Sequence, residues 1–276
     1  MSLDYLFPIT ESHAIQSVIF VLEWQGEISD RALQEVQSLG QSLKSHFPIS
    51  TVQKVVMVNL DQATSGSPAI QQNGDAMGGV VFQRMGKFGQ VASQMVVSRN
   101  NCLIAINEYS RWDAILEAVM RYYKIVLPPI LREKSIGSIA LQYNDMFTWK
   151  DEPANLNLRE VFKTDTPYLA PNSFEQKGLW HCHHGFIRDL EGVDGTCLDN
   201  INVSVVNNQD DRAIQILTSH KLTLNSPLRI ATKDYLQSIE KYQNILHQEN
   251  KLVLGQLLSE EVCEKIKLKN QADTQN

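Results

Sequence analysis

The spacing of hydrophobic positions changes several times along the chain, and each change predicts a new element. Residues 14–24 are mostly apolar without interruption, which is typical of a strand in the middle of a covered sheet. Apolar residues at three- and four-residue spacing over 33–47 then predict a helix, which Ser29 begins and Pro48 ends. The chain therefore opens with a buried strand followed by an amphipathic helix.

Most of the remaining elements are expected to be strands that come in groups. Strand patterns follow at 52–60, 80–85, 91–98, 102–107 and 135–149, and again at 178–189, 196–206 and 213–224. Helical patterns occupy 110–127, where Pro128 and Pro129 are expected to end the helix, and then 157–163, 235–246 and 252–266. Because the strands do not alternate strictly with helices, their order favours an α+β fold of mainly antiparallel sheets packed with helices.

Two polar segments interrupt these patterns. The segment 150–157 contains Pro153 and is the best candidate for a boundary. We therefore expect two similar-sized lobes: an N-terminal α+β lobe over 1–149, and a C-terminal α+β lobe over 150–276 that ends in long helices. Residues 61–79 are rich in Gly, Ser, Gln and Asn and lack periodicity, which predicts a surface loop and the most protease-sensitive internal segment.

The bulk composition argues against several classes of protein. A formal net charge of −6 disfavours a general duplex-DNA binder, because phosphate contacts require a basic surface. The N-terminus lacks a basic segment followed by a long apolar stretch, and no apolar run is long enough to span a bilayer. We therefore expect a cytoplasmic protein that does not enter the membrane. The four cysteines form no C-x-x-C pair, which predicts reduced thiols, and no motif indicates a cofactor.

Short stretches along nearly the whole chain resemble one family. They are the opening strand 15–22, the helix end 46–48, the helix start 109–112, the strand 139–144, the stretch 198–201, and His247 after Ile245 and Leu246. In these stretches the chain is similar to a sporadically distributed bacterial family of unknown function, whose members have about this length. The resemblance implies an α+β fold and a bacterial or phage origin, and it supplies no catalytic residues. The patchy distribution of the family resembles that of mobile, defence-associated or toxin–antitoxin genes.

Residues 180–186 concentrate the side chains that could perform chemistry, with three histidines and one cysteine. On a strand, His181 and His183 share one face, and two imidazoles so placed can bind zinc. A zinc site also needs a third ligand, which Asp199, Asp194 or Cys197 on the neighbouring strand would have to supply. Because no second spaced pair of ligands occurs, we favour a structural or binding role, with Asp199 as the hydrogen-bond partner of one imidazole.

Basic residues provide a second candidate surface. Arg84, Lys87 and Arg111 could contact the phosphates of a small nucleotide, and Arg111 with Trp112 could bind single-stranded nucleic acid. In the alternative interpretation, Trp112 belongs to the core and the arginines are solvated. No phosphate-binding loop opens onto a helix, and neither a nucleophile elbow nor an H-E-x-x-H motif is present.

The sequence therefore favours a non-enzymatic interaction protein that binds a partner protein, such as an antitoxin, an immunity protein or a phage-defence component. The edges of antiparallel sheets can pair with a partner strand or with a second copy of the chain. Two alternatives stay open. One is a metal-dependent hydrolase of nucleotides or nucleic acids centred on His181 and His183, and the other is a sensor of a small nucleotide.

Overall fold

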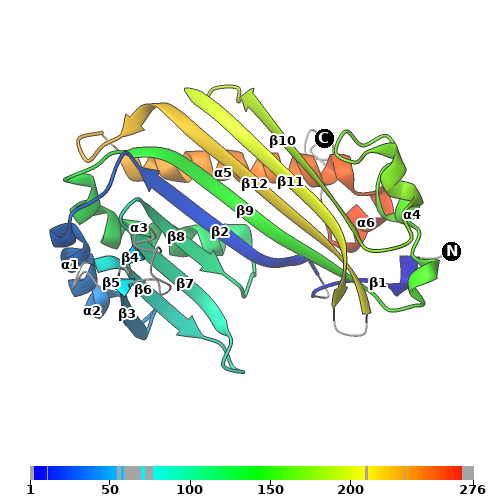
Figure 1. The fold of residues 1–276 in the computed structure, drawn as a ribbon. Coiled ribbons are helices and arrows are strands. Elements are labelled where there is room, and N and C mark those ends of the chain that lie inside the picture. The colour runs from blue at the N-terminus through cyan, green and yellow to red at the C-terminus, as the bar shows by residue number, and fades with distance from the viewer. Residues whose placement is uncertain are drawn as a thin grey trace, which may run out of the picture.

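The computed structural model describes residues 3–10, 12–54, 57–58, 70–71, 77–208, 211–232 and 234–268, so most of the loop predicted over 61–79 lies outside the described residues. The N-terminal half contains β1 (Leu6–Pro8), β2 (Ile15–Trp24), α1 (Asp30–Ser38), α2 (Gly40–Leu43), β3 (Ile49–Lys54), β4 (Met57–Val58), β5 (Ile70–Gln71), β6 (Met77–Met85), β7 (Val91–Ser98), β8 (Asn101–Ile106) and α3 (Trp112–Leu131). The C-terminal half contains β9 (Ile136–Trp149), α4 (Leu158–Val161), β10 (Trp180–Asp189), β11 (Gly195–Asn208), β12 (Asp211–Leu228), α5 (Tyr235–Leu257) and α6 (Glu260–Lys265) (Figure 1).

One antiparallel sheet of ten strands joins both halves of the chain. Its order is β10-β11-β12-β9-β2-β8-β7-β6-β3, and β1 pairs with the end of β9. The first long strands of the two halves, β2 and β9, meet at the centre, where Val18 lies opposite Tyr143 and Phe20 lies opposite Leu141. β10 and β3 are therefore the edge strands of the sheet.

The two halves have similar topologies, although among the described residues the meander has four strands (β3, β6, β7 and β8) in the first half and three (β10, β11 and β12) in the second. In each half the first long strand, β2 or β9, pairs with the last strand of the meander that follows it, β8 or β12. Helices precede each meander, and one long helix follows it, α3 in the first half and α5 in the second. The halves thus match in connection, although the sequence shows no residue-level repeat.

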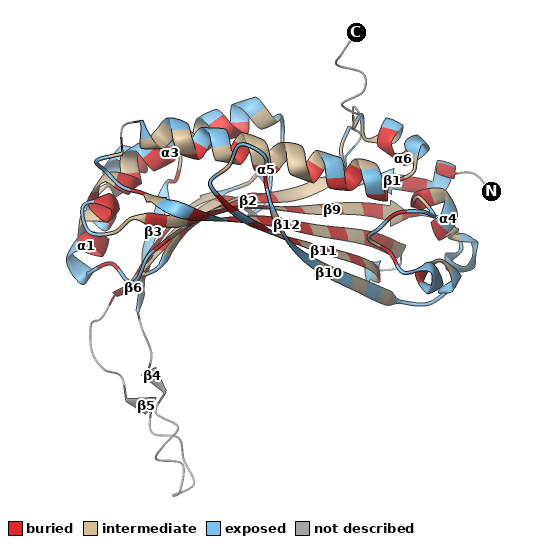
Figure 2. Ribbon diagram, turned by 90° about the horizontal axis from the view of Figure 1, so that it is seen from above, coloured by how far each residue is buried: buried red, intermediate tan, exposed pale blue. Residues whose placement is uncertain are grey.

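The long helices α3 and α5 lie on the same face of the sheet, which we call the inner face (Figure 2). In the part of the chain that the structure describes, no helix covers the opposite face. On β2, Val18, Phe20 and Leu22 point inward and are fully buried, whereas Ile19 and Val21 point outward and are half-buried. The strand over 14–24 is thus covered on one face only. The prediction that both faces of its sheet are covered is wrong.

The predicted α+β fold with antiparallel strands is confirmed. The two halves share one continuous sheet, and a boundary between residues 149 and 150 stays a prediction. Pro128 and Pro129 do not end α3, which continues to Leu131. A proline removes one backbone hydrogen bond and disturbs the turn before it, but burial of Ile130 and Leu131 holds the last turn in place.

Candidate functional site

The histidine cluster lies on β10, an edge strand whose side chains alternate between the two faces of the sheet. His181 and His183 are exposed on the outer face, opposite Ser204 and Asn202 of β11. As predicted, they share one face. Within the described residues, no group of three or more His, Cys, Asp or Glu side chains could hold a metal ion. The structure therefore adds no third protein ligand to this pair.

Asp199 does not reach either of these histidines. It points from β11 to the inner face, where its carboxylate is almost completely buried. Its Oδ1 lies 2.6 Å from Nδ1 of His220 on β12, and its Oδ2 accepts a 2.5 Å hydrogen bond from Nε of Arg188 on β10. The predicted pairing of Asp199 with one imidazole of the cluster His181–His184 is thus wrong, because Asp199 pairs with His220 instead.

This ionic network continues to the helix that covers it. The guanidinium of Arg188 also donates to Glu249 of α5, and Nη2 of Arg188 lies 2.6 Å from Oε2 of Glu249. Burial by itself would raise the pKa of Asp199, but the bonds from His220 and Arg188 outweigh burial and lower it. Asp199 is therefore an ionised carboxylate held between two donors, and it ties β10, β11 and β12 together beneath α5.

A polar seam extends the network along α5. Thr218 of β12 donates a 2.5 Å hydrogen bond to Oδ1 of Asn250, and Oη of Tyr143 lies 2.7 Å from Nδ1 of His247. The indole of Trp112 stacks on the ring of His247 with centroids 4.1 Å apart. Burial, with a smaller contribution from the charge of Lys251, lowers the pKa of His247 to about 4. His247 is thus uncharged at neutral pH, so the part of the seam that Trp112 contacts carries no charge.

Arg84 and Arg111 lie away from these groups. Arg84 forms an exposed ion pair with Glu108, in which Nη1 of Arg84 lies 3.1 Å from Oε2 of Glu108. Arg111 is exposed at the position that precedes α3. Lys87 is exposed in the turn between β6 and β7. The structure does not bring these cations together with the histidines of β10 into one site.

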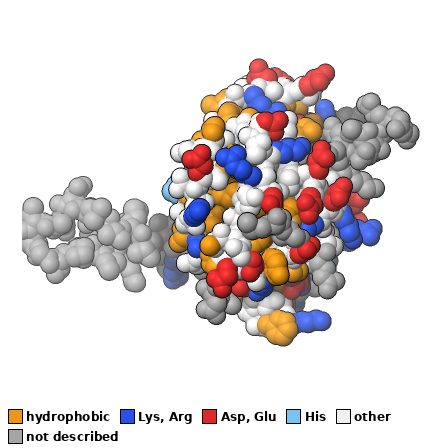
Figure 3. Space-filling model, turned by 90° about the vertical axis from the view of Figure 1, so that its right-hand side faces the viewer, with side chains coloured by type: hydrophobic (Ala, Val, Ile, Leu, Met, Phe, Trp, Pro, Cys, Tyr) orange, Lys and Arg blue, Asp and Glu red, His pale blue; other side chains and the backbone are white. Residues whose placement is uncertain are grey.

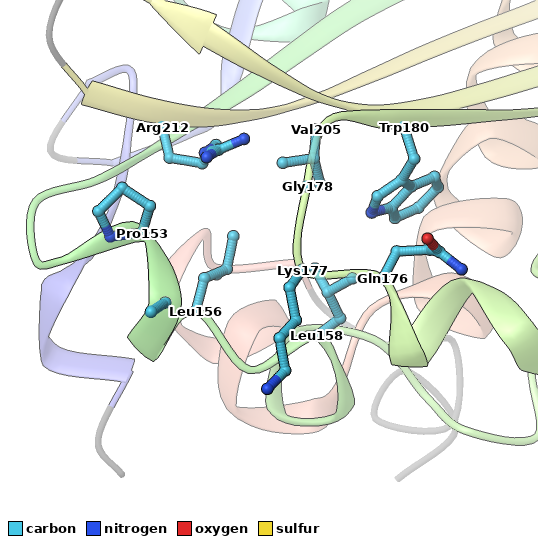
Figure 4. Close-up of a pocket in the computed structure, with 10 residues that line it drawn as sticks. Pro153, Leu156, Leu158, Gln176, Lys177, Gly178, Trp180, Val205 and Arg212 are labelled. Carbon is cyan, nitrogen blue, oxygen red and sulfur yellow. The ribbon is translucent and has the colours of Figure 1, made fainter.

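A small cavity lies under the end of the inner face, between the sheet and the irregular segments of the C-terminal half. Its volume is about 10 Å³, which is room for roughly one water molecule. Arg212 and Trp180 approach it from the sheet, and Leu156 and Leu158 form part of the opposite wall (Figure 4). The cavity is too small for an organic ligand.

The outer face of the sheet carries no helix in the described structure, and we call it the open face. Its centre is a chain of amides, because Asn144 donates to Gln16 at 2.6 Å and accepts from Gln215 at 3.0 Å. Half-buried aliphatic side chains on the same face are Ile19, Val21, Val96, Leu103, Leu198 and Leu217. The charges of Lys221 and Glu23 neutralise each other across 2.6 Å.

Sequence reasoning missed the buried network, although the chain carries a signal for it. On β12, Thr218 and His220 stand in the same alternation phase as the buried residues Ile216 and Leu222. On β11, Asp199 stands in the phase of buried neighbours in the same way. Polar side chains in a buried phase must find partners, so these positions predict an internal network.

The comparisons with known proteins leave the site to be interpreted from its own chemistry. No protein-family model matches the chain, and no curated protein is significantly similar to it.

In the part of the chain described, every helix is too short or too polar to cross a membrane. At the end of the molecule near α4 and α6, acidic and basic side chains are interspersed without a large patch of one sign (Figure 3).

Proposed function

We propose that this chain is a non-enzymatic binding protein that receives a partner protein on the open face of its sheet. The observation that supports this proposal is the position of α3 and α5 on a single face, which leaves the opposite face uncovered among the described residues (Figure 2). Neighbouring strands lie about 4.8 Å apart, so the nine strands in hydrogen-bonded order span roughly 40 Å. A face of that width can provide the roughly 800 Å² per partner that a stable protein–protein interface buries.

The composition of the open face favours a protein over a nucleic acid. Its centre combines aliphatic side chains with uncharged amides, which resembles the core of a protein–protein interface. A polyanion would need unpaired cations, but Lys221 is neutralised by Glu23. A protein partner with a complementary aliphatic and amide surface is therefore the occupant that we propose.

The edge strand β10 offers a continuation of this surface. It pairs with β11 on one side only, and Phe186 and Ile187 near its end are 40% and 76% exposed. An extended segment of the partner could add to this edge through backbone hydrogen bonds, next to His181 and His183. This arrangement would give the two histidines a binding role without a metal.

The resemblance to a patchily distributed bacterial family supports a more specific form of the proposal. In that form the partner is a toxin, an effector or another component of a phage-defence system, and this chain is its antitoxin, immunity protein or defence partner. A cytoplasmic location belongs to the same proposal.

The test compares two charge insertions at equivalent residue types. Leu217→Arg places a cation at the centre of the open face, and Leu252→Arg places one on the solvent side of α5, where Leu252 is 38% exposed. The tagged wild type and both variants are expressed in the native host, and co-purifying proteins are quantified by mass spectrometry. The identified partner is then purified, and its Kd for each protein is measured by calorimetry.

We expect Leu217→Arg to weaken binding by about tenfold or more, because a buried unpaired charge at an interface costs more than about 1.4 kcal/mol. Leu252→Arg should bind like the wild type. Equal binding by all three proteins, or the absence of any partner of the wild type, would overturn the proposal. A dimer of this chain that dissociates in Leu217→Arg would also overturn it, because a second copy would then cover the face.

A further inference from the structure

Cys182 and His184 lie side by side on the inner face of β10, two residues apart on the same strand. Sγ of Cys182 is 3.2 Å from Nε2 of His184, which is within hydrogen-bond reach. The imidazole of His184 stacks almost parallel to the ring of Phe186, with an interplanar angle of 2°. A thiol and an imidazole are thus within hydrogen-bond reach of each other, as they are in activated nucleophilic cysteines.

The environment of Cys182 differs from that of the other three cysteines. Cys102, Cys197 and Cys263 are buried, whereas Cys182 is partly exposed. Burial raises the pKa of Cys102 to about 12, and burial together with the charge of Asp199 raises that of Cys197 to about 12. Because the thiolate is the reactive form, these buried thiols are poor nucleophiles.

We propose that Cys182 and His184 form a nucleophilic thiol–imidazole pair, and that Cys182 is the site at which low-molecular-mass disulfides modify this chain. The ligand class is a small, soluble disulfide such as that of a glutathione-type thiol. This inference does not depend on the proposed function, because Cys182 points to the inner face of β10 and its reaction needs only this chain and a small disulfide.

The reaction is a thiol–disulfide exchange in which Nε2 of His184 accepts the proton of Cys182. The thiolate attacks one sulfur of the small disulfide, so that a bond forms between Sγ and that sulfur while the original sulfur–sulfur bond breaks. The second sulfur leaves as a thiolate and takes the proton back from His184. One protein thiol and one small disulfide thus become one mixed disulfide and one small thiol, with no net oxidation.

Peptide mapping of the wild type tests the site without any substitution. The reduced, folded protein is exposed to glutathione disulfide at neutral pH, digested under non-reducing conditions and analysed by mass spectrometry. We expect the glutathionyl group on Cys182 and none on the three buried cysteines. Modification of Cys102, Cys197 or Cys263 before Cys182, or no adduct on the folded protein, would overturn the proposal.

Stopped-flow kinetics with an aromatic disulfide test the role of the imidazole. Cys182→Ser should abolish the fast phase, and His184→Gln should slow it by about tenfold or more. His46→Gln is the matched control, because His46 is a partly exposed histidine that follows α2, far along the sheet from β10, and its loss should leave the rate unchanged. Far-ultraviolet circular dichroism verifies folding, and His184→Asn replaces His184→Gln if the latter unfolds. Equal rates for the folded His184 variant and the wild type would disprove the pair.

Discussion

The helices α3 and α5 occupy equivalent positions in the two halves, but the surfaces that they bury are chemically different. The buried stripe of α3 is almost entirely hydrophobic, and its members are Ile115, Val119, Tyr123, Val126 and Ile130. The corresponding stripe of α5 alternates hydrophobic and amide side chains, because Gln243 and Asn250 stand between Ile239, Leu246 and Val253. Both helices repeat at three- and four-residue spacing, so the difference lies in chemistry and not in geometry.

The comparison shows that the topology does not require polar groups beneath the long helix. The first half forms a hydrophobic core with the same connections, whereas the second half buries Asp199, Thr218 and His220 against α5. Buried ionic and amide groups contribute little net stability compared with apolar packing, and they are costly when a partner is missing. We infer that the C-terminal half keeps them because they fix a unique alignment of β10, β11 and β12, the strands that present the candidate site.

Removal of Asp199 should produce the largest loss of stability on the polar side of this comparison. In Asp199→Ala, the buried His220 and the guanidinium of Arg188 lose their shared acceptor. Breaking a buried ionic pair in this way costs about 3–5 kcal/mol. Chemical denaturation measures the free energy of unfolding. Asp189→Ala is the control, because Asp189 is exposed on the same hairpin and its loss should change stability by no more than about 0.5 kcal/mol.

A loss as small as that of the control would contradict this reading of the network. It would show that the seam beneath α5 tolerates an unpaired imidazole and a guanidinium that keeps only Glu249 as its partner, as a solvated surface does. The contrast between the two halves would then concern composition alone.

Asp145 makes the free energy of unfolding depend on pH. It lies on the inner face of β9, and burial raises its pKa to about 7 from an ordinary value of 3.8. Between these two values the folded protein holds a proton that the unfolded chain releases, so the free energy of unfolding falls as pH rises. The slope is about 1.4 kcal/mol per pH unit, which amounts to about 4 kcal/mol in total, and it vanishes above pH 7.

Asp145→Asn lacks this titration and should become more stable than the wild type as pH rises from 4 to 7. Unfolding by urea at pH 4, 5, 6, 7 and 8 measures the difference between the two proteins. His247 contributes to both curves, so its titration largely cancels in the difference. Parallel curves across this range would show that Asp145 is ionised in the folded protein.

The strands and helices were more predictable from the sequence than the faces that bring the site together. The alternation over 135–149 and the stripe of α5 follow from local periodicity. β9 occurs close to where it was predicted, whereas α5 begins at the predicted residue 235 but continues past the predicted end at 246 to Leu257. The partner of Asp199 depends instead on the register of two hairpins. The turn after β10 contains Gly192 with a φ of +70°, and it places Asp199 opposite Phe186. A shift of one residue would have put Asp199 on the face of His181 and His183, and no local pattern decides between the two registers.

The pairing of the two halves also could not be predicted locally. The contact between β2 and β9 joins residues more than one hundred positions apart in sequence, such as Val18 and Tyr143. Their hydrophobic patterns are compatible with many neighbours. The polar residues in buried phase on β11 and β12 are the feature that sequence reasoning can use, because each of them requires an internal partner.

The smallest expected effect is also the most direct test of what the polar seam contributes. Thr218→Val removes the donor to the buried Oδ1 of Asn250, and an unsatisfied acceptor costs about 1–3 kcal/mol. Adding Asn250→Leu removes that acceptor and makes this part of α5 resemble α3. The double variant should therefore unfold within about 1 kcal/mol of the wild type, with a coupling energy that offsets the single losses. Urea denaturation of the four proteins in this cycle measures that coupling. If the double variant instead loses the sum of the two single losses, the amide of Asn250 stabilises the half through contacts other than Thr218, and the seam is more than a set of matched pairs.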